Sequence, residues 1–316
     1  MEREGIELSS LIRLWACVFI SILIGACESG ADGLDIAQFE ADVITWREGR
    51  RERLMAPTGY LTLAGLFWLE KPITTFGSAA DHIVLFPQKA APHIGEFRLT
   101  DEGVVMVAEQ DVDVRSDGEA VQTILIADDT TESPIMITHG SLAWTVIKRD
   151  GRFAVRLRDT ENPVLETFPT LKYFPIDPGW RIDATFRRYD QPHTVAVETV
   201  IEGLGWNPES PGVVVFEKDG EVFELEGYAS GDQLFFVFGD RTNGRETYPA
   251  GRFLYAAMPE DGGQTVLDFN RAYSPPCAFN DFSTCPVATP RNRLATVVAA
   301  GELFNRDAYV GKVETH

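Results

Sequence analysis

The run "AWTVIKRDGRFAVRLRD", residues 143–159, predicts the class of fold that this chain adopts. Two stretches rich in β-branched and aromatic residues flank Asp150-Gly151, a dipeptide that favours the tight turn of a β-hairpin. Similar short runs fill most of the chain, and two more dipeptides of this kind stand at Asp219-Gly220 and Asn243-Gly244. Short strands at regular spacing with such turns predict a mainly β protein, a β-sandwich or barrel-like antiparallel sheets.

One amphipathic helix is predicted ahead of the strands, over residues 35–54. Its apolar side chains recur at three- and four-residue spacing and so form one stripe. The members of the stripe are Ile36, Phe39, Val43 and Trp46. Pro57 and Gly59 end this helix. A second, short helix is predicted over residues 292–300.

Composition divides the chain into four segments. They are a signal peptide at 1–27, a tether with the amphipathic helix at 28–56, an N-terminal β subdomain at 57–160, and a C-terminal β subdomain at 161–316. Within the third segment, "TTFGSAADHIVLFP" resembles the opening of forkhead-associated β-sandwich domains. Ser78 stands where those domains carry the Arg that binds phosphothreonine, so the resemblance implies a sandwich and does not extend to a phosphopeptide site.

The first segment resembles the signal peptide of a bacterial lipoprotein. An apolar run from Leu14 to Ile24 is too short for a comfortable membrane span. The residues Ile24-Gly25-Ala26-Cys27 resemble a lipobox, in which the cysteine is lipidated and becomes the new N-terminus. A plain signal peptide with an ordinary cysteine is the alternative. The resemblance implies an exported protein, lipid-anchored through Cys27 in the cell envelope, at the periplasmic face of the outer membrane if the host is Gram-negative.

The charge balance limits the classes of partner and cofactor. With 28 Lys and Arg against 48 Asp and Glu, the formal net charge is −20. This surplus of acid argues against a nucleic-acid partner, and it keeps an exported protein dispersed. The histidines are scattered without metal-ligand spacing, and the Walker, dinucleotide and metallohydrolase motifs are absent. The sequence therefore predicts no metal site and no cofactor.

A dense group of polar residues surrounds the Asn-Gly turn of "FGDRTNGRETYPAGRFL", residues 238–254. If strands pair through this turn, carboxylates and guanidiniums alternate across a narrow ribbon. The group is interpreted either as a polar site for a carboxylate, phosphate or sugar, or as a surface hairpin whose charges pair with each other. The ligand-binding candidates are Thr242, Tyr248, Arg252, Asn270, Tyr273 and Asn292, and the candidate catalytic carboxylates are Asp240, Glu246, Asp268 and Glu302.

The stretch "LDFNRAYSPPCAFNDFSTCP", residues 267–286, holds two cysteines between prolines. Behind an export signal the compartment is oxidising, so Cys277 and Cys285 are predicted to form a disulfide that clamps the loop. Reduced structural thiols, or a metal or catalytic role, are the alternatives. Two cysteines without nearby histidines leave a zinc coordination sphere incomplete.

Three stretches resemble one family: "GYLTLAGLFWL", "DRTNGRETYPAGRFL" and "LDFNRAYSPPCAFNDFSTCPVATPRNRLATVVAAGE". They are similar to the uncharacterised bacterial domain-of-unknown-function family number sixteen eighty-four, over about Trp46 to Glu302. Ser274 stands where the family often has Asn. The resemblance implies no particular activity, substrate or catalytic residue. Relatives without an export signal carry the same cysteines, which implies a role for the pair beyond a disulfide.

Two functions of different classes remain open on the sequence. The favoured one is a lipid-anchored cell-envelope protein that binds a small ligand or envelope glycan in a β-rich pocket. The alternative is a hydrolase that uses the candidate carboxylates, with Arg252 and Tyr248 orienting the substrate, since paired carboxylates suit general acid–base chemistry. A structural lipoprotein that recognises protein partners has no positive signal in the sequence.

Overall fold

The computed structural model describes residues 34–260 and 262–309 of the 316-residue chain. The predicted signal peptide and Cys27 lie outside the described residues. Within the described part, no helix combines the length and the apolar character that crossing a membrane requires. The described residues from Ile36 onward belong to one compact unit.

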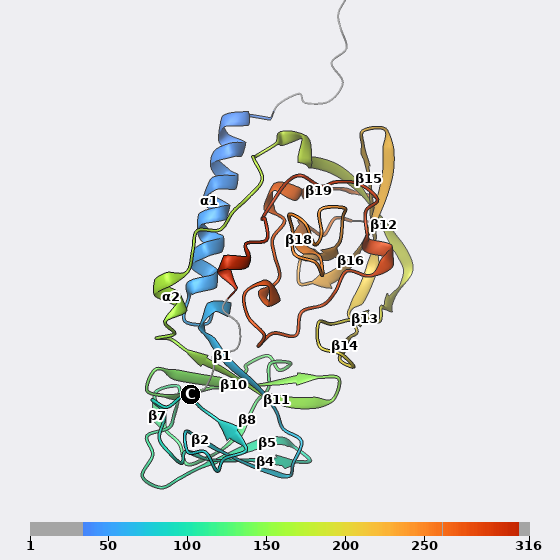
Figure 1. Cartoon of the computed structure of the whole chain (residues 1–316). Coiled ribbons are helices and arrows are strands. Elements are labelled where there is room, and N and C mark those ends of the chain that lie inside the picture. Colours follow the sequence, from blue (N-terminus) through green and yellow to red (C-terminus); the bar gives the residue numbers. More distant parts are fainter. Residues whose placement is uncertain (1–33, 261, 310–316) are drawn as a thin grey trace, which may run out of the picture. The chain divides into compact units, whose positions relative to one another are not determined.

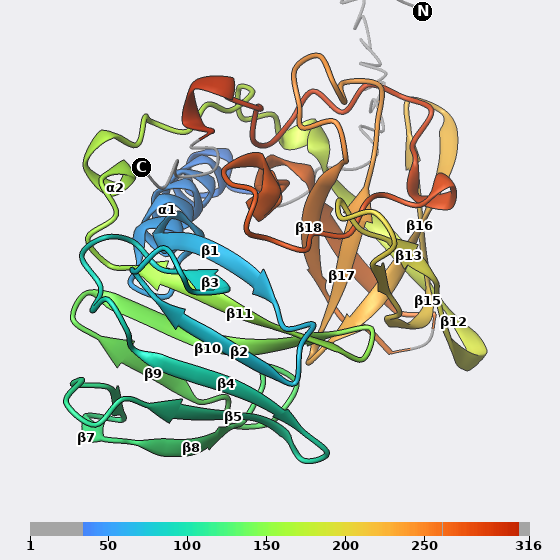
Figure 2. The same cartoon turned by 60° about the horizontal axis from the view of Figure 1, so that its bottom comes forward.

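The predicted turn at Asp150-Gly151 joins strands β10 (Leu142–Arg149) and β11 (Arg152–Asp159) in the first sheet (Figure 2). The strands pair antiparallel with Arg149 opposite Arg152. Asp150 and Gly151 have φ angles of 49° and 75°, as a tight turn with two left-handed residues requires. The sheet has the order β1-β11-β10-β9-β6-β7, with β1 Leu63–Trp68, β6 Arg115–Ser116, β7 Glu119–Ala120 and β9 Met136–His139.

A second sheet packs face to face on the first, and together they form a sandwich that we call the first lobe. Its order is β3-β2-β4-β5-β8, with β2 Ile73–Gly77, β3 Val84–Leu85, β4 Gly95–Thr100, β5 Gly103–Ala108 and β8 Thr123–Ile126. Only the β2–β3 pair among these described strands is parallel. Trp144 of β10 contacts the rings of Phe76 and Phe86 at centroid distances of 5.7 and 5.3 Å, so aromatic packing holds the sandwich together.

The second lobe is one six-stranded antiparallel sheet that is nearly closed into a barrel. Its order is β18-β17-β16-β15-β12-β19, with β12 Arg181–Thr194, β15 Glu209–Lys218, β16 Glu221–Ser230, β17 Gln233–Phe238, β18 Arg252–Ala257 and β19 Gln264–Asp268. The hydroxyl of Thr265 donates to the carbonyl of Ala257 at 2.8 Å and links the two edge strands. A short pair, β13 (Val197–Glu198) and β14 (Gly205–Trp206), lies outside the barrel sheet. The prediction of a mainly β, antiparallel and barrel-like protein is confirmed.

The predicted N-terminal helix is α1, Ile36–Met55, and Figure 1 shows it as the one long helix of the described chain. Its buried stripe is Phe39, Val43, Arg50 and Leu54. Ile36 is not part of it and is 46% exposed. The other helical segments are short: α2 Val164–Thr167, η1 Tyr60–Thr62, η2 Pro178–Trp180, η3 Phe269–Arg271, η4 Pro276–Ala278, η5 Pro290–Asn292 and η6 Arg306–Ala308.

Two local predictions are wrong. The Asn243-Gly244 dipeptide does not close a two-residue hairpin, because β17 ends at Phe238, β18 begins at Arg252, and a long loop lies between them. The helix predicted over residues 292–300 is limited to the last residue of η5. The chain that follows instead pairs with the loop after β17, where the amide of Leu294 donates to the carbonyl of Gly239 at 2.8 Å.

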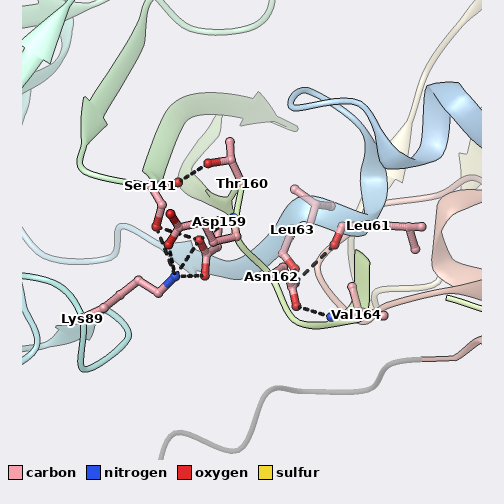
Figure 3. A network of polar contacts seen from close by, with 9 residues as sticks. Leu61, Leu63, Lys89, Ser141, Asp159, Thr160, Asn162 and Val164 are labelled. Carbon is pink, nitrogen blue, oxygen red and sulfur yellow. Dashed lines mark hydrogen bonds and ion pairs between the residues drawn. The ribbon is translucent and has the colours of Figure 1, made fainter. Parts of the chain in front are cut away.

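A polar network fixes the end of β11 (Figure 3). The buried carboxylate of Asp159 accepts from Lys89 Nζ at 3.0 Å and from the hydroxyl of Ser141 at 2.9 Å. Burial lowers the pKa of Lys89, but its hydrogen bonds to Asp159 and Glu161 outweigh this and raise the pKa overall. The last residue of β11 is therefore held by groups from two other parts of the first lobe.

The chain that leaves β11 is held by Asn162, whose side chain is buried (Figure 3). Its amide nitrogen donates to the carbonyls of Leu61 and Leu63 at 3.2 and 3.4 Å. Its carbonyl oxygen accepts from the amide of Val164 at 3.2 Å, at the start of α2. These hydrogen bonds attach the segment that connects the two lobes to the chain at the start of β1. They therefore also hold the C-terminal end of β11 in place.

Candidate functional site

A cleft of about 1080 Å³ is lined by residues of α1 and of both lobes. The tip of the β10–β11 hairpin contributes from the first lobe. The segments around β14, β17 and β18 contribute from the second lobe. Figures 1 and 2 both place this hairpin beside that end of the second lobe. A volume of this size accommodates a ligand larger than a single phosphate or sugar ring.

The second lobe supplies a continuous row of aromatic side chains, which we call the aromatic wall: Trp206, Phe235, Phe253, Tyr255 and Tyr273. The rings are connected through Phe235 and Phe253, whose centroids are 4.9 Å apart. Phe235 lies 6.0 Å from Trp206 and 4.8 Å from Tyr255, measured between ring centroids. Phe253 lies 5.8 Å from Tyr273. Burial raises the pKa of Tyr255 and of Tyr273, so both hydroxyls stay protonated and remain able to donate at neutral pH.

The first lobe supplies what we call the basic hairpin: Lys148, Arg149 and Arg156 of β10 and β11. In all, six cationic side chains and two carboxylates line the cleft. The cations are Arg50, Arg53, Lys148, Arg149, Arg156 and Arg271, and the carboxylates are Asp129 and Asp150. This local surplus of positive charge is the reverse of the whole chain, whose formal net charge is −20.

Three of these cations already have carboxylate partners. Arg149 holds Asp129 with two hydrogen bonds of 2.9 and 2.6 Å, a bidentate pair. The Nε of Arg50 lies 3.3 Å from Glu302, and the Nε of Arg271 lies 3.1 Å from Asp268. These ion pairs connect residues around the cleft, and they neutralise three of its six positive charges.

Arg156 differs from these three, because its side chain is half-buried and has no hydrogen bond or ion pair among the described residues. Its Nε has no accessible surface and no partner. Burial lowers the pKa of Arg156, and the charge of Arg149 lowers it further, against Tyr60 and Asp129, which raise it. The neighbouring Arg158 donates to Gly59, and burial together with the charge of Arg156 lowers its pKa to about 10. The nearby acidic groups therefore do not compensate fully for the burial of Arg156 and for the charge of Arg149.

The predicted polar hairpin is not part of this cleft. Asp240 and Arg252 form an ion pair of 2.8 Å, and both side chains have 0% exposure. Arg252 also donates to the carbonyls of Val298 and Ala300. The other carboxylate oxygen of Asp240 accepts from the amides of Thr242 and Val298. Apart from the local bond with Thr242, these contacts join separate segments of the second lobe, so the pair is part of the core.

Of the ligand-binding and catalytic candidates, Tyr273 lines the cleft and the others lie outside its lining. Asn270 exchanges two hydrogen bonds of 2.9 Å with the backbone of Asp177. Asn292 does the same with the backbone of Glu226 at 2.8 and 2.9 Å.

The candidate carboxylates other than Asp240 have three different environments. Glu246 is exposed. Asp268 caps η3 through the amide of Asn270. Glu302 is buried against Arg50, and burial raises its pKa although Arg50 lowers it.

The two remaining ligand-binding candidates make contacts within the protein. Tyr248 packs on Phe304, and the hydroxyl of Thr242 forms a hydrogen bond with the hydroxyl of Thr247.

The two cysteines of the C-terminal loop are free thiols and are buried. The predicted disulfide is therefore not formed in this structure. The sulfur of Cys277 donates to the carbonyl of Ser283 at 3.3 Å, and the amide of Cys277 donates to the sulfur of Cys285 at 3.2 Å. Cys285 lines the cleft, and burial raises the pKa of its thiol well above the ordinary value. A thiol with a raised pKa is a poor nucleophile at neutral pH.

Among the described residues, one group of side chains could hold a metal ion, although the sequence predicts none. Asp81, His82 and His93 place their ligand atoms within 4.8 Å of one another in the first lobe. Nδ1 of His93 lies 2.9 Å from Nε2 of His82, and the latter is also 2.9 Å from the carbonyl of Pro92. None of the three lines the cleft.

Comparison with known proteins gives a family for the chain. It belongs to the family described as "Protein of unknown function (DUF1684)", whose model matches residues 166–303. The match is shorter than the range of the resemblance seen in the sequence, and it contains the whole aromatic wall but not the basic hairpin.

The solved structures that are similar to part of the chain include the solution NMR structure of an uncharacterized protein of Haloarcula marismortui, 31% identical in sequence. The similarity covers 45% of this chain and 80% of that one, with a TM-score of 0.38. No curated protein matches the chain.

Sequence reasoning missed most of the cleft, including Arg156 and Trp206. The one signal for Arg156 is the alternation in "AVRLRD", in which Arg156 and Arg158 share the strand face opposite the core residues Val155 and Leu157. Charged residues on one strand face ordinarily point to water, so the pattern alone does not indicate a site.

Proposed function

We propose that this protein binds a small ligand, such as an envelope glycan, in the cleft between the two lobes. The observation that carries this proposal is the aromatic wall, a continuous row of rings of which Tyr255 is still 40% exposed. Flat aromatic side chains offer a large contact area to a ring-shaped ligand at little cost in conformational entropy. The hydroxyls of Tyr255 and Tyr273 add hydrogen-bond donors at the same surface.

We propose in addition that the protein works in the cell envelope, held there by a lipid on Cys27. The support is the lipobox-like sequence Ile24-Gly25-Ala26-Cys27 and the acidic composition of the chain. Metabolic labelling of the expressed full chain with a fatty acid tests this. Label should enter the wild type and not the Cys27→Ala variant, and label in both would remove the anchor from the proposal.

The binding proposal is tested by titrating the purified protein with ring-shaped probes while tryptophan fluorescence is recorded. Trp206 lines the cleft, whereas Trp68 of β1 does not, so the variants Trp206→Ala and Trp68→Ala form a matched pair. Loss of the aromatic contact should weaken binding by roughly 1–3 kcal/mol in the first variant and leave it unchanged in the second. Equal affinity in both variants, or binding by no probe, would remove the basis of the proposal.

The hydrolase alternative lacks support in the geometry. Asp240 is saturated by Arg252 and two amides, and Glu302 is paired with Arg50. Glu246 lies on the surface and Asp268 caps η3. General acid–base catalysis by a pair of carboxylates needs both to reach one substrate, and none of these four lines the cleft. A ligand-binding role therefore has the stronger observations.

A further inference from the structure

We infer that the ligand of the cleft is a phosphorylated ring compound, with the phosphate bound by Arg156 of the basic hairpin and the ring placed on the aromatic wall. This inference rests on the proposed function and names the chemical class of its ligand. Neutral glycans would satisfy the proposed function but not this inference.

The first argument is the unpaired state of Arg156. A guanidinium carries five donors, and burying any of them without an acceptor is costly. In Arg156 the Nε has no partner, and no carboxylate within the described residues forms an ion pair with the group. Arg252 is the contrasting arginine of the core: its Nε also has no partner, but its terminal nitrogens form an ion pair and bind two carbonyls. The free donors of Arg156 therefore suit an anionic group from outside the chain.

The second argument is the charge that remains after the internal pairs are removed. Arg50, Arg149 and Arg271 are neutralised by Glu302, Asp129 and Asp268. Among the described residues that line the cleft, the cations left without a carboxylate are Arg53, Lys148 and Arg156, and the carboxylate left without a cation is Asp150.

A surplus of two positive charges results, within a chain whose formal net charge is −20. A phosphate monoester carries a charge of about −1.5 to −2 at pH 7, which matches this surplus. A single carboxylate carries half as much. Arginine also binds phosphate with a planar fork of two parallel hydrogen bonds.

The third argument is size. The cleft volume of about 1080 Å³ leaves room beside a phosphate, and the remaining surface is the aromatic wall. Stacking of a planar or sugar ring on tryptophan, tyrosine and phenylalanine requires no particular charge on that ring. A sugar phosphate and a nucleoside monophosphate share the required chemistry, a phosphate monoester attached to a ring.

The test measures the affinity of the full-length protein for matched probes by isothermal titration calorimetry. The probes are glucose 6-phosphate with glucose, adenosine 5′-monophosphate with adenosine, and inorganic phosphate alone. At least one phosphorylated ring should bind roughly 10- to 100-fold more tightly than its neutral counterpart and more tightly than inorganic phosphate. The two pairs distinguish a sugar phosphate from a nucleotide.

The variant Arg156→Gln removes the charge and keeps a polar side chain. Arg152→Gln is the matched control on the same strand, because Arg152 is exposed, lies near Glu70 and does not line the cleft. In Arg156→Gln the preference for the phosphorylated probe should fall by roughly 10- to 100-fold, and affinity for the neutral ring should not change. In Arg152→Gln both affinities should equal those of the wild type.

A thermal unfolding measurement without ligand separates binding from a structural role. Since Arg156 has no internal partner, Arg156→Gln should unfold at the same temperature as the wild type or at a higher one. A lower unfolding temperature together with equal loss of affinity for neutral and phosphorylated rings would assign Arg156 to the structure and overturn the inference.

Two further outcomes are decisive. If neutral and phosphorylated rings bind equally well, the proposed function stands and the inference of a phosphorylated ligand is wrong. If no ring probe binds, phosphorylated or neutral, the proposed function fails and this inference fails with it.

Discussion

Replacing Arg252 by methionine tests whether the predicted polar hairpin belongs to the core or to a ligand site. The Arg252 side chain has 0% exposure and makes an ion pair of 2.8 Å with Asp240, whose side chain is equally buried. Removing one partner of a buried ion pair typically costs 3–5 kcal/mol, because the other charge is left without compensation. The carbonyls of Val298 and Ala300 also lose their donor. We expect Arg252→Met to lower the free energy of unfolding by about 3–5 kcal/mol.

Urea unfolding followed by circular dichroism measures this loss as a shift of the midpoint at constant slope. The exposed pair of Arg187 and Glu224 is a suitable control, since its atoms are 2.7 Å apart but its side chains are 59% and 40% exposed. Arg187→Met should cost no more than about 1 kcal/mol. The double variant Asp240→Asn with Arg252→Met should recover part of the loss, because no buried charge is then left alone.

A loss below about 1 kcal/mol in Arg252→Met would refute the assignment of this pair to the core, since a surface pair costs that much. If stability is unchanged but affinity for a cleft ligand is lost, Arg252 is an anion-binding residue. This is one of the two interpretations of the polar hairpin that the sequence allows.

Two more predictions follow from other buried positions. Gly251→Ala should lower the free energy of unfolding by about 2 kcal/mol or more, because Gly251 has a φ of +111° and a Cβ would lie 2.6 Å from the carbonyl oxygen of Phe238. Gly118→Ala, at φ 84° with no atom within 4 Å, should cost less in the same urea measurement, and equal losses would contradict the role of the clash. Glu302→Gln tests a pH dependence: burial raises the pKa of Glu302 above its unfolded value of about 4.3. The free-energy contribution of this group is fully present below the unfolded pKa and is lost as pH rises through the folded pKa. The stability of the wild type relative to Glu302→Gln should therefore fall as pH rises above the unfolded pKa of about 4.3 in urea titrations. A constant or rising difference would show that the carboxyl group is not destabilised by burial.

Sequence rules that use only a few neighbouring residues were sufficient to predict two hairpin turns and the amphipathic helix. Asp150-Gly151 and Asp219-Gly220 both close hairpins, with Lys218 opposite Glu221 in the second case. The amphipathic helix begins and ends within about one residue of its predicted bounds. These features follow from backbone dihedral preferences and from side-chain periodicity, which act over a few residues and can be read in order along the chain.

The same rules failed where distant segments compete. Asn243-Gly244 has the sequence of a hairpin turn, yet the side chain of Asn243 donates to the hydroxyl of Thr247 and the carbonyl of Tyr248, inside a longer loop. Residues 292–300 are not helical, because the loop after β17 offers hydrogen-bond partners to an extended chain there. Tertiary hydrogen bonds to these segments outweighed the local preference.

The difference between what the sequence and what the tertiary structure determined is clearest for two arginines that look alike in the sequence. Arg156 and Arg252 both stand in strands between apolar residues, and the sequence favoured Arg252 as the ligand-binding one. The fold places Asp240 against Arg252 and leaves Arg156 without a partner beside an aromatic wall. The sequence by itself determined that the chain is β-rich and acidic and has one amphipathic helix ahead of the strands. Which cation is neutralised and which remains free was decided by tertiary structure, because the energy of a charge depends on its burial and on distances across the fold.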